Sequence, residues 1–372
     1  MKKRWTIPTL ALCLSLGVGV VACDDKKADE TEASKDESKK KDDDDDKDKD
    51  EDDDKDAKKD KKDKDKPASS GDAHAASAHL PDSCDAVTHV DIAKVMGSAP
   101  VKKHIVPALE AAQKKQEGKD AEKGDQSFTA FLKEADLDPR KDLTERAVCV
   151  SKTPIGGGGG DPDSGFALSG NLKKNILDAL KKSSKDEKLT DIEIDGIKAL
   201  TNDDKDMYVA QAEDGVLVLA STEAMLKSMY KSSKAHEEYK LPDTGISIVV
   251  PGKIVKQAME QSQGGGDNPF KPHAANAGRA AITADPTNGN VELRIDMGNE
   301  KAAIELGGFV KTLMPKLTEG PPSQDPMGAM AQGMLKDAKV DNQGSELVIT
   351  LKVPADQLDA MAKQAAAAIG EG

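Results

Sequence analysis

The sequence predicts an α+β protein with antiparallel sheets and helices packed on one sheet face. One unit recurs along the chain, in which two short strands joined by a tight turn run directly into a helix. A strand that leads straight into a helix opens each half, at 86–92 and at 246–250. Apolar and polar residues alternate over 291–297, which is typical of a half-buried antiparallel strand. The order β-α-ββα-ββα would therefore occur twice, as an internal duplication.

The clearest copy of this unit lies in the first half. Strands at 207–212 and 216–220 flank Asp214-Gly215, a strong hairpin signal. Thr222 then caps a helix over 223–230. We expect the other copies as strand, strand and helix at these ranges: 147–151, 166–169 and 172–180; 280–284, 291–297 and 300–313; 338–341, 346–353 and 356–369.

The N-terminus has the features of a secretory signal. Three basic residues within 1–4 precede an apolar run over 5–22, which is too short to span a bilayer comfortably. The run ends in Val20-Val21-Ala22-Cys23, which resembles the bacterial lipobox with Val20 in place of the usual leucine. We therefore predict a signal peptide over 1–22 and lipid attachment at Cys23, including an amide-linked acyl chain such as palmitate. A plain cleaved signal or an uncleaved anchor is the alternative.

The segment behind Cys23 predicts a disordered tether over 23–80. Residues 24–66 hold 22 Asp or Glu and 15 Lys with only small residues between them, so they cannot bury enough apolar surface to fold. Contact with charged wall polymers is a further reading of this low-complexity region. A shared metal at His74 and His79 is another, although we expect both histidines to be spectators.

The tether and the anchor predict a location in the bacterial cell envelope. Its length favours the outer membrane or the cell surface. Asp24, directly after Cys23, also resembles the signal that keeps enterobacterial lipoproteins in the inner membrane. The inner membrane is therefore an alternative location. The folded part would then comprise a first half over 81–240 and a second half over 241–372.

Four cysteines are present, and the predicted signal and lipid anchor leave two of them for the folded part. Cys13 leaves with the signal and Cys23 carries lipid, so Cys84 and Cys149 remain. An even pair in an oxidising compartment predicts a disulfide. Two independent buried thiols are the alternative.

No residue pattern predicts catalysis, a cofactor or a metal site. His236-Glu237-Glu238-Tyr239-Lys240 begins like a zinc protease helix, but Lys240 stands where the second histidine belongs. The glycine run 156–160 is not followed by the Gly-Lys-Ser/Thr of a phosphate loop. His89 lies on the first strand, where we expect it to face solvent. With a formal net charge of −14, the chain also lacks the basic surface that nucleic acid requires.

Three methionines, Met327, Met330 and Met334, recur at helical spacing. Methionine ligands favour Cu(I), but a flexible methionine face more often packs on a core or a greasy ligand. We interpret these residues as a candidate lid for an apolar ligand.

The overall layout resembles uncharacterised lipoproteins of predatory and social delta-proteobacteria, including myxobacteria. The resemblance rests on the lipobox, the low-complexity leader, Leu80-Pro81-Asp82, the segments 131–133 and 137–143, and the repeated strand-helix units. It covers about residues 80–370 and implies a similar fold without a known activity.

Two functions follow as hypotheses. The first is a membrane-anchored envelope lipoprotein with a non-enzymatic binding or scaffolding role, held off the bilayer by its tether. Its partners would be the membrane through the lipid, and envelope proteins or wall polymers. The alternative is a carrier of lipid or another apolar ligand in the space between a curved sheet and its helices.

Overall fold

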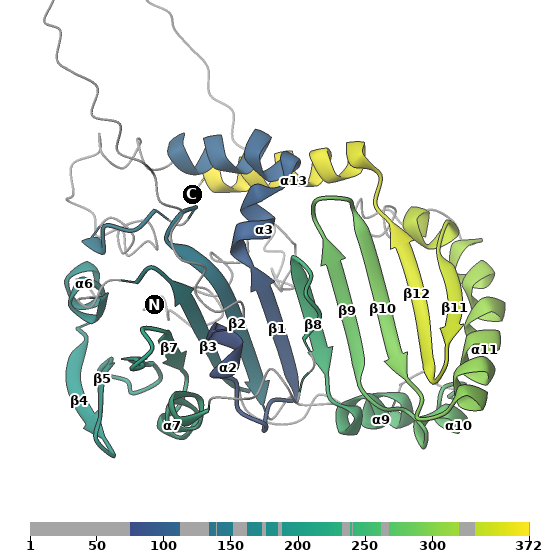
Figure 1. Ribbon diagram of the computed structural model, residues 1–372, viewed down its shortest axis with the longest axis horizontal. Helices are drawn as coiled ribbons and strands as arrows, with labels where there is room; N and C mark the ends of the chain where they lie inside the picture. Colours follow the sequence, from purple (N-terminus) through teal and green to yellow (C-terminus); the bar gives the residue numbers. More distant parts are fainter. Residues whose placement is uncertain are drawn as a thin grey trace, which may run out of the picture. The chain divides into compact units, whose positions relative to one another are not determined.

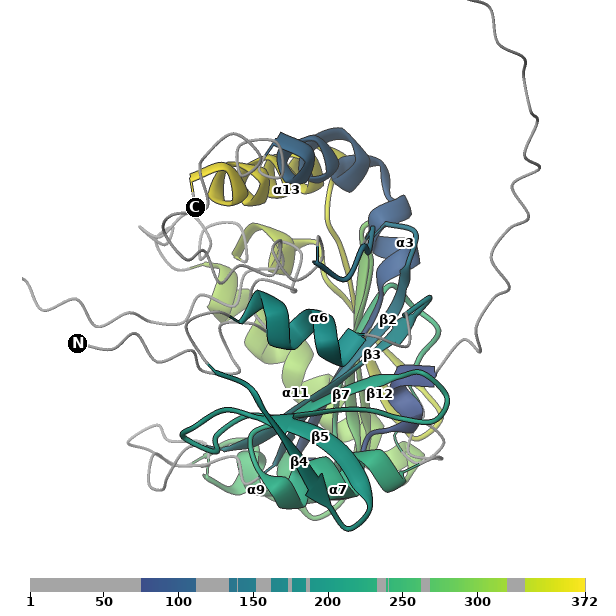
Figure 2. The same ribbon diagram turned by 90° about the vertical axis from the view of Figure 1, so that its left-hand side faces the viewer.

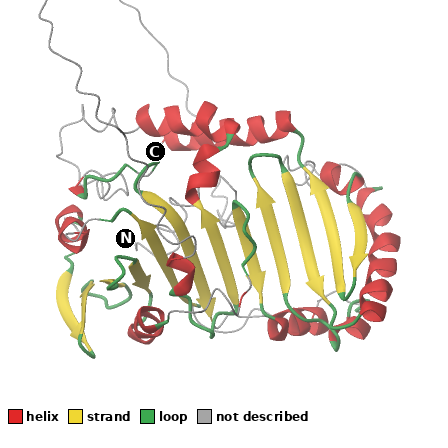
Figure 3. Cartoon of the chain, in the orientation of Figure 1, coloured by secondary structure: helices red, strands yellow, loops and turns green. Residues whose placement is uncertain are grey.

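One antiparallel sheet of twelve strands organises the part of the chain that the computed structural model describes. The strand order is β11-β12-β10-β9-β8-β1-β2-β3-β7-β6-β5-β4 (Figures 1 and 3). The described residues are 75–111, 134–138, 140–151, 162–172, 176–184, 188–232, 239, 241–261, 268–319 and 332–371. The predicted signal peptide and most of the predicted tether lie outside these residues.

The strands are β1 (Ala86–Asp91), β2 (Leu143–Ser151), β3 (Asp163–Gly170), β4 (Thr190–Ile194), β5 (Ile197–Thr201), β6 (Tyr208–Gln211), β7 (Leu217–Ala220), β8 (Ile246–Val250), β9 (Ala280–Asp285), β10 (Asn290–Asp296), β11 (Lys339–Gln343) and β12 (Glu346–Lys352). The helices are α2 (Ala75–Ala78), α3 (Ile92–Gly97), the π-helix η1 (Val101–Ile105), α6 (Ile176–Ser183), α7 (Glu223–Lys231), α9 (Gly252–Gln261), α10 (Lys271–Ala274), α11 (Glu300–Thr318) and α13 (Ala355–Glu371). The mixture of helices with one large antiparallel sheet confirms the predicted α+β class.

The two halves of the chain meet where β1 pairs with β8. The pairing is antiparallel, with Thr88 opposite Ile248 and His89 opposite Ser247. Outward from this pair, the first half continues as β2, β3, β7 and β6, and the second half as β9, β10, β12 and β11. Both halves thus follow the predicted order β-α-ββα-ββα, and they share one sheet.

The hairpin β4–β5 is an addition to the first half that our sequence analysis missed. It lies between α6 and β6 and extends the sheet at one edge. Its turn is Asp195-Gly196, with positive φ angles of 51° and 83°. Asp-Gly between two strands is a strong hairpin signal here as at 214–215, so the signal was present in the sequence.

Helices cover both faces of the sheet in the first half, whereas we predicted helices on one face only. Phe166 and Leu168 of β3 pack toward α3 and α6, while Ala167 between them packs toward α2 and α7. Strands β3 and β7 carry consecutive apolar residues, so each of their faces needs a cover. We call the side that α3, α6, α9 and α11 cover the helix face and the opposite side the α2 face. Figure 2 shows α6 and α11 together on one side of the sheet.

Polar side chains start helices α7 and α11, and Thr222 is the cap that we expected for α7. The Thr222 hydroxyl accepts a hydrogen bond from the amide of Met225 at 3.2 Å, and the Asn299 side chain accepts one from the amide of Ala302 at 2.9 Å. Helix α11 runs to Thr318, five residues beyond its predicted end, with Pro315 inside it.

The C-terminal helix is tied to the first half by charge. The Asp359 carboxylate of α13 accepts hydrogen bonds from Lys103 Nζ and His104 Nε2 of η1, each at 2.9 Å. Figure 1 shows α13 running across one end of the sheet. The two halves are thus joined by helices as well as by strands β1 and β8.

The predicted disulfide is present. Cys84 and Cys149 are bonded, their Cα atoms are 5.4 Å apart, and neither side chain is exposed. Cys84 lies just before β1, and Cys149 lies on β2 opposite Val87. The bond therefore fastens the start of the folded part to a central strand.

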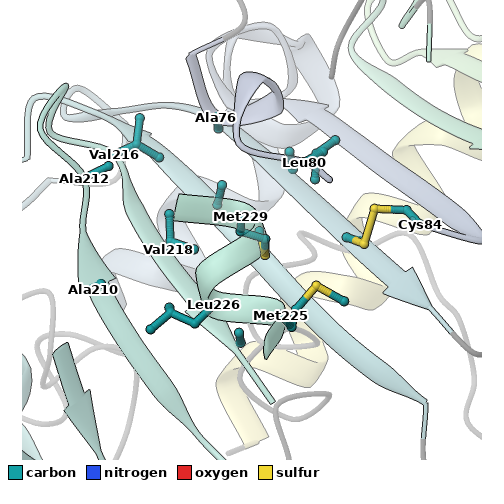
Figure 4. Packing of buried hydrophobic residues seen from close by; sticks show 14 of the residues in the cluster. Ala76, Leu80, Cys84, Ala210, Ala212, Val216, Val218, Met225, Leu226 and Met229 are labelled. Carbon is teal, nitrogen blue, oxygen red and sulfur yellow. A yellow bond between two sulfur atoms is a disulfide. The ribbon is translucent and has the colours of Figure 1, made fainter. Parts of the chain in front are cut away.

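Residues 75–80, which we predicted as the end of the tether, are folded. Ala76 and Leu80 are fully buried against the α2 face, in the cluster that also holds Met225 and Met229 of α7 (Figure 4). The sequence reads as a continuation of the small, polar leader, but alanine is small enough to let α2 lie close on β2 and β3.

His79 is part of this docked segment rather than a spectator. Its Nε2 lies 2.9 Å from the Asp214 carboxylate, and its Nδ1 lies 3.1 Å from the Met229 carbonyl oxygen. The ring is buried. It therefore joins the segment to the β6–β7 turn and to α7.

His89 is also buried, in contrast to our expectation that it faces solvent. His89 and Val87 are two residues apart on a strand, so both point to the α2 face. His89 Nε2 lies 2.8 Å from Glu145, and the Glu145 carboxylate also accepts the amide hydrogens of Ala76 at 2.8 Å and Ser77 at 3.3 Å. Burial alone would raise the pKa of Glu145, but the hydrogen bond and charge of His89, with the Ser77 side chain and the Ala76 amide, hold it below its ordinary value.

Removal of the disulfide should lower the free energy of unfolding by about 4 kcal/mol, as expected for a loop of 65 residues. The double variant Cys84→Ala, Cys149→Ala tests this in urea. Reduction of the wild-type protein should produce a similar loss, and an unchanged midpoint in both cases would contradict a stabilising crosslink.

Glu145→Gln should lower the free energy of unfolding at pH 7 by about 3 kcal/mol, because it leaves His89 buried without its carboxylate. The pKa of Glu145 is lowered on folding, so its contribution is present above pH 4.5 and is lost as the pH falls through the lower folded pKa. Urea unfolding at pH 7 and pH 3 should show a difference from wild type that shrinks at pH 3. Glu193→Gln, at an exposed position, is the control.

Candidate functional site

The two faces of the sheet differ sharply in the second half. On the α2 face, Arg294 of β10 donates hydrogen bonds to Glu346 at 3.0 Å and to Gln343 at 3.1 Å, and also to Glu292. Glu292 and, to a lesser degree, Glu346 raise the pKa of Arg294. The side chains of β10 on this face are therefore polar. The residues between these charges, such as Leu293, point to the helix face.

Strand register aligns one apolar residue from each strand across the helix face of the second half. We call this set the central row: Val340 of β11, Ile349 of β12, Leu293 of β10, Ile282 of β9 and Ile248 of β8. Each residue lies directly opposite the next. The row arises because alternating apolar residues on neighbouring strands fall in register.

The middle of the central row is open among the described residues. The Ile282 side chain is 42 % exposed, and its neighbours Ile248 and Leu293 are only half-buried. At the outer end, by contrast, α11 packs on Val340 and Ile349. Ile282 therefore faces the side on which helices pack, yet it lacks the cover that the outer strands have.

Helix α11 is set close to β11 by a glycine. A Cβ atom at Gly307 would lie 2.6 Å from the Asn342 side-chain oxygen, so a larger residue would push the helix outward. Beyond this contact, the end of α11 and the start of β11 enclose a cleft of about 350 Å³. Its lining is apolar except for three side chains, Lys311, Thr318 and Lys336.

The candidate methionine lid falls partly outside the described residues. Met327 and Met330 are not described. Met334 is half-buried and directly precedes Leu335 and Lys336, which line the cleft beside α11. The lid remains a prediction.

A buried arginine on the helix face escaped our sequence analysis. Arg146 of β2 is 5 % exposed, and its guanidinium carbon lies 5.8 Å from the centre of the Phe166 ring. No carboxylate of the described residues pairs with it, and its buried Nε has no hydrogen-bond partner. Burial lowers its pKa to about 10, so it is cationic at neutral pH. A basic residue leading into the apolar run 147–150 was the available signal.

Arg146 lies on the same face as the central row. It points to the same side of β2 as Val148, and Val148 aligns through Thr88 with Ile248. In the next row of paired residues on this face, Arg146 lies opposite Val90, and Val90 lies opposite Ile246. The arginine thus adjoins the apolar surface of β1 and β8.

The other predicted site residues are the three cysteines. Cys23 lies outside the described residues, and Cys84 with Cys149 forms a structural crosslink. Within the described residues, no group of three His, Cys, Asp or Glu side chains is placed to hold a metal ion. None of the described helices is both long and apolar enough to cross a membrane.

Comparison with known proteins gives no family. No family model and no curated protein matches the chain. Among solved structures, crystal forms III, I and IV of a protein called TP0453 are similar, with 10 %, 10 % and 9 % sequence identity. The matches cover 77–79 % of this chain and 96–98 % of that one, with TM-scores of 0.38–0.39. We draw no functional argument from a likeness at this level.

Proposed function

We propose that this protein is a non-enzymatic carrier of an apolar ligand in the bacterial cell envelope, anchored by lipid at Cys23. The observation that supports the carrier over a purely scaffolding role is the exposed Ile282 on the helix face. The ligand would lie over the middle of the central row, where Ile248, Ile282 and Leu293 are incompletely covered.

Burial of apolar surface would supply the affinity. Covering these three side chains removes apolar area from water at about 25 cal/mol per Å². The surrounding helices limit the open surface, since α9 and α11 cover apolar residues at its outer side and α3 and η1 lie on the first half.

The predicted tether would hold this site away from the bilayer. Residues 24–74 precede α2 and could span roughly 170 Å when fully extended. Envelope proteins or wall polymers remain proposed partners of the scaffolding hypothesis. We include no nucleic-acid partner, because the chain is acidic.

Ile282→Asp should weaken binding of the neutral apolar dye N-phenyl-1-naphthylamine about ten-fold, because it places a charge in the proposed site. The control is Ile304→Asp on α11, since Ile304 is also exposed, at 52 %, but lies outside the row. Fluorescence titration measures the Kd, and both variants should keep their unfolding free energy within about 1 kcal/mol of wild type. Equal effects of the two variants, or no dye binding by wild type, would contradict the carrier.

Cys23→Ser should release the protein from membranes, because a lipidated cysteine carrying several acyl chains anchors stably. Fractionation of cells into membrane and soluble parts measures this. A neighbouring change, Ser34→Ala, should leave the protein in the membrane fraction. Retention of the Cys23→Ser variant would argue against the lipid anchor.

A further inference from the structure

We propose that the apolar ligand is a long-chain carboxylate, whose head group pairs with Arg146 while its chain lies over the central row. This inference rests on the proposed carrier function and specifies the ligand class. It is carried by the juxtaposition of a buried, unpaired guanidinium with an open apolar surface on the same sheet face.

Arg146 is the buried charge that the described structure does not neutralise. The residue is 5 % exposed, and no carboxylate of the described ranges pairs with it. An uncompensated charge in a protein interior is costly, and such charges are normally paired or hydrogen-bonded. The contact with Phe166 at 5.8 Å is a weak substitute for a counter-ion.

Other charged groups near β2 are already engaged elsewhere. Glu145, the preceding residue, points to the α2 face and binds His89 and the amides of α2. Asp91 also points to that face, opposite Glu145, and caps α3 by accepting the amide hydrogen of Lys94. Neither carboxylate is on the side of Arg146, so a ligand carboxylate would be its counter-ion.

A carboxylate suits the chemistry of this group. The planar guanidinium offers parallel N–H donors that match the two oxygens of a carboxylate, and such pairs strengthen where water is excluded. At neutral pH the guanidinium remains charged, because burial lowers its pKa only to about 10.

The path from Arg146 to the central row is apolar. In register with Arg146 lie Val90, Ile246 and Ala284, all on the helix face and all half-buried. The three strand spacings from β2 to β9 amount to about 14 Å. An extended fatty acyl chain spans this distance and would cover Ile248 and Ile282 on the way.

The test compares a fluorescent fatty acid, cis-parinaric acid, with its uncharged methyl ester. Both are titrated into the full chain carrying Cys23→Ser, so that no attached lipid competes. Arg146→Met keeps an unbranched apolar stem and removes the charge, and Arg146→Lys keeps the charge. Arg294→Met is the matched control, since Arg294 is on the opposite face and is paired with Glu292 and Glu346.

The wild-type protein should bind the acid at least ten-fold more tightly than the ester. Arg146→Met should remove this preference by weakening acid binding about ten-fold, with ester binding unchanged, while Arg146→Lys should keep part of it. Arg294→Met should change neither. Oleate should raise the Tm of wild type but not that of Arg146→Met. The melting transition of Arg146→Met also shows that this variant folds.

Three results would overturn the proposal in distinguishable ways. Equal binding of acid and ester by wild type would exclude a carboxylate head-group site and leave the carrier function intact. A loss of acid binding in Lys311→Gln, Lys336→Gln but not in Arg146→Met would place the head group in the cleft beside α11 instead. Failure of wild type to bind either probe would remove the carrier function together with this inference.

Discussion

The antiparallel pairing of β1 with β8 is the interaction on which the rest of the structure depends. Each half would otherwise end in an unpaired edge strand, with a row of open backbone hydrogen-bonding groups. The pairing places Val90 opposite Ile246 and Thr88 opposite Ile248, so apolar residues of both halves lie on one face. Only because of this register do Arg146, from the first half, and Ile282, from the second half, belong to the same surface.

The duplicated order of elements hides an asymmetry in how the halves are covered. In the first half, β3 and β7 have apolar residues on both faces, and α2 and α7 add a second layer of cover. In the second half, β10 alternates strictly, and its polar face is held by the ion pairs of Arg294 with Glu292 and Glu346. Helix α11 covers the outer strands but leaves Ile282 open. The difference in side-chain pattern, rather than in topology, creates the candidate site.

Three buried or half-buried charges show how differently the same sheet treats ionic groups. Glu145 has a histidine and two amide donors, and Arg294 has two carboxylates, so both are well compensated. Arg146, next to Glu145 in sequence but on the opposite face, lies against Phe166 without a described carboxylate. Adjacent residues on a strand point to opposite sides of the sheet, so Glu145 cannot form an ion pair with Arg146. This geometry leaves Arg146 without a carboxylate partner among the described residues.

Local chemistry in the sequence determined most of the strands and helices and one crosslink. The Asp-Gly turn at 214–215, the caps Thr222 and Asn299, and the alternation over 291–297 are short-range signals, and an even pair of cysteines predicted the bond between Cys84 and Cys149. The fold of residues 75–80, the burial of His79 and His89, and the site at Arg146 and Ile282 depended on tertiary structure. The docking of residues 75–80 and the burial of His79 and His89 arise from pairings between residues more than 50 positions apart, such as His89 with Glu145. Such pairings follow from strand order and register, which no local pattern specifies.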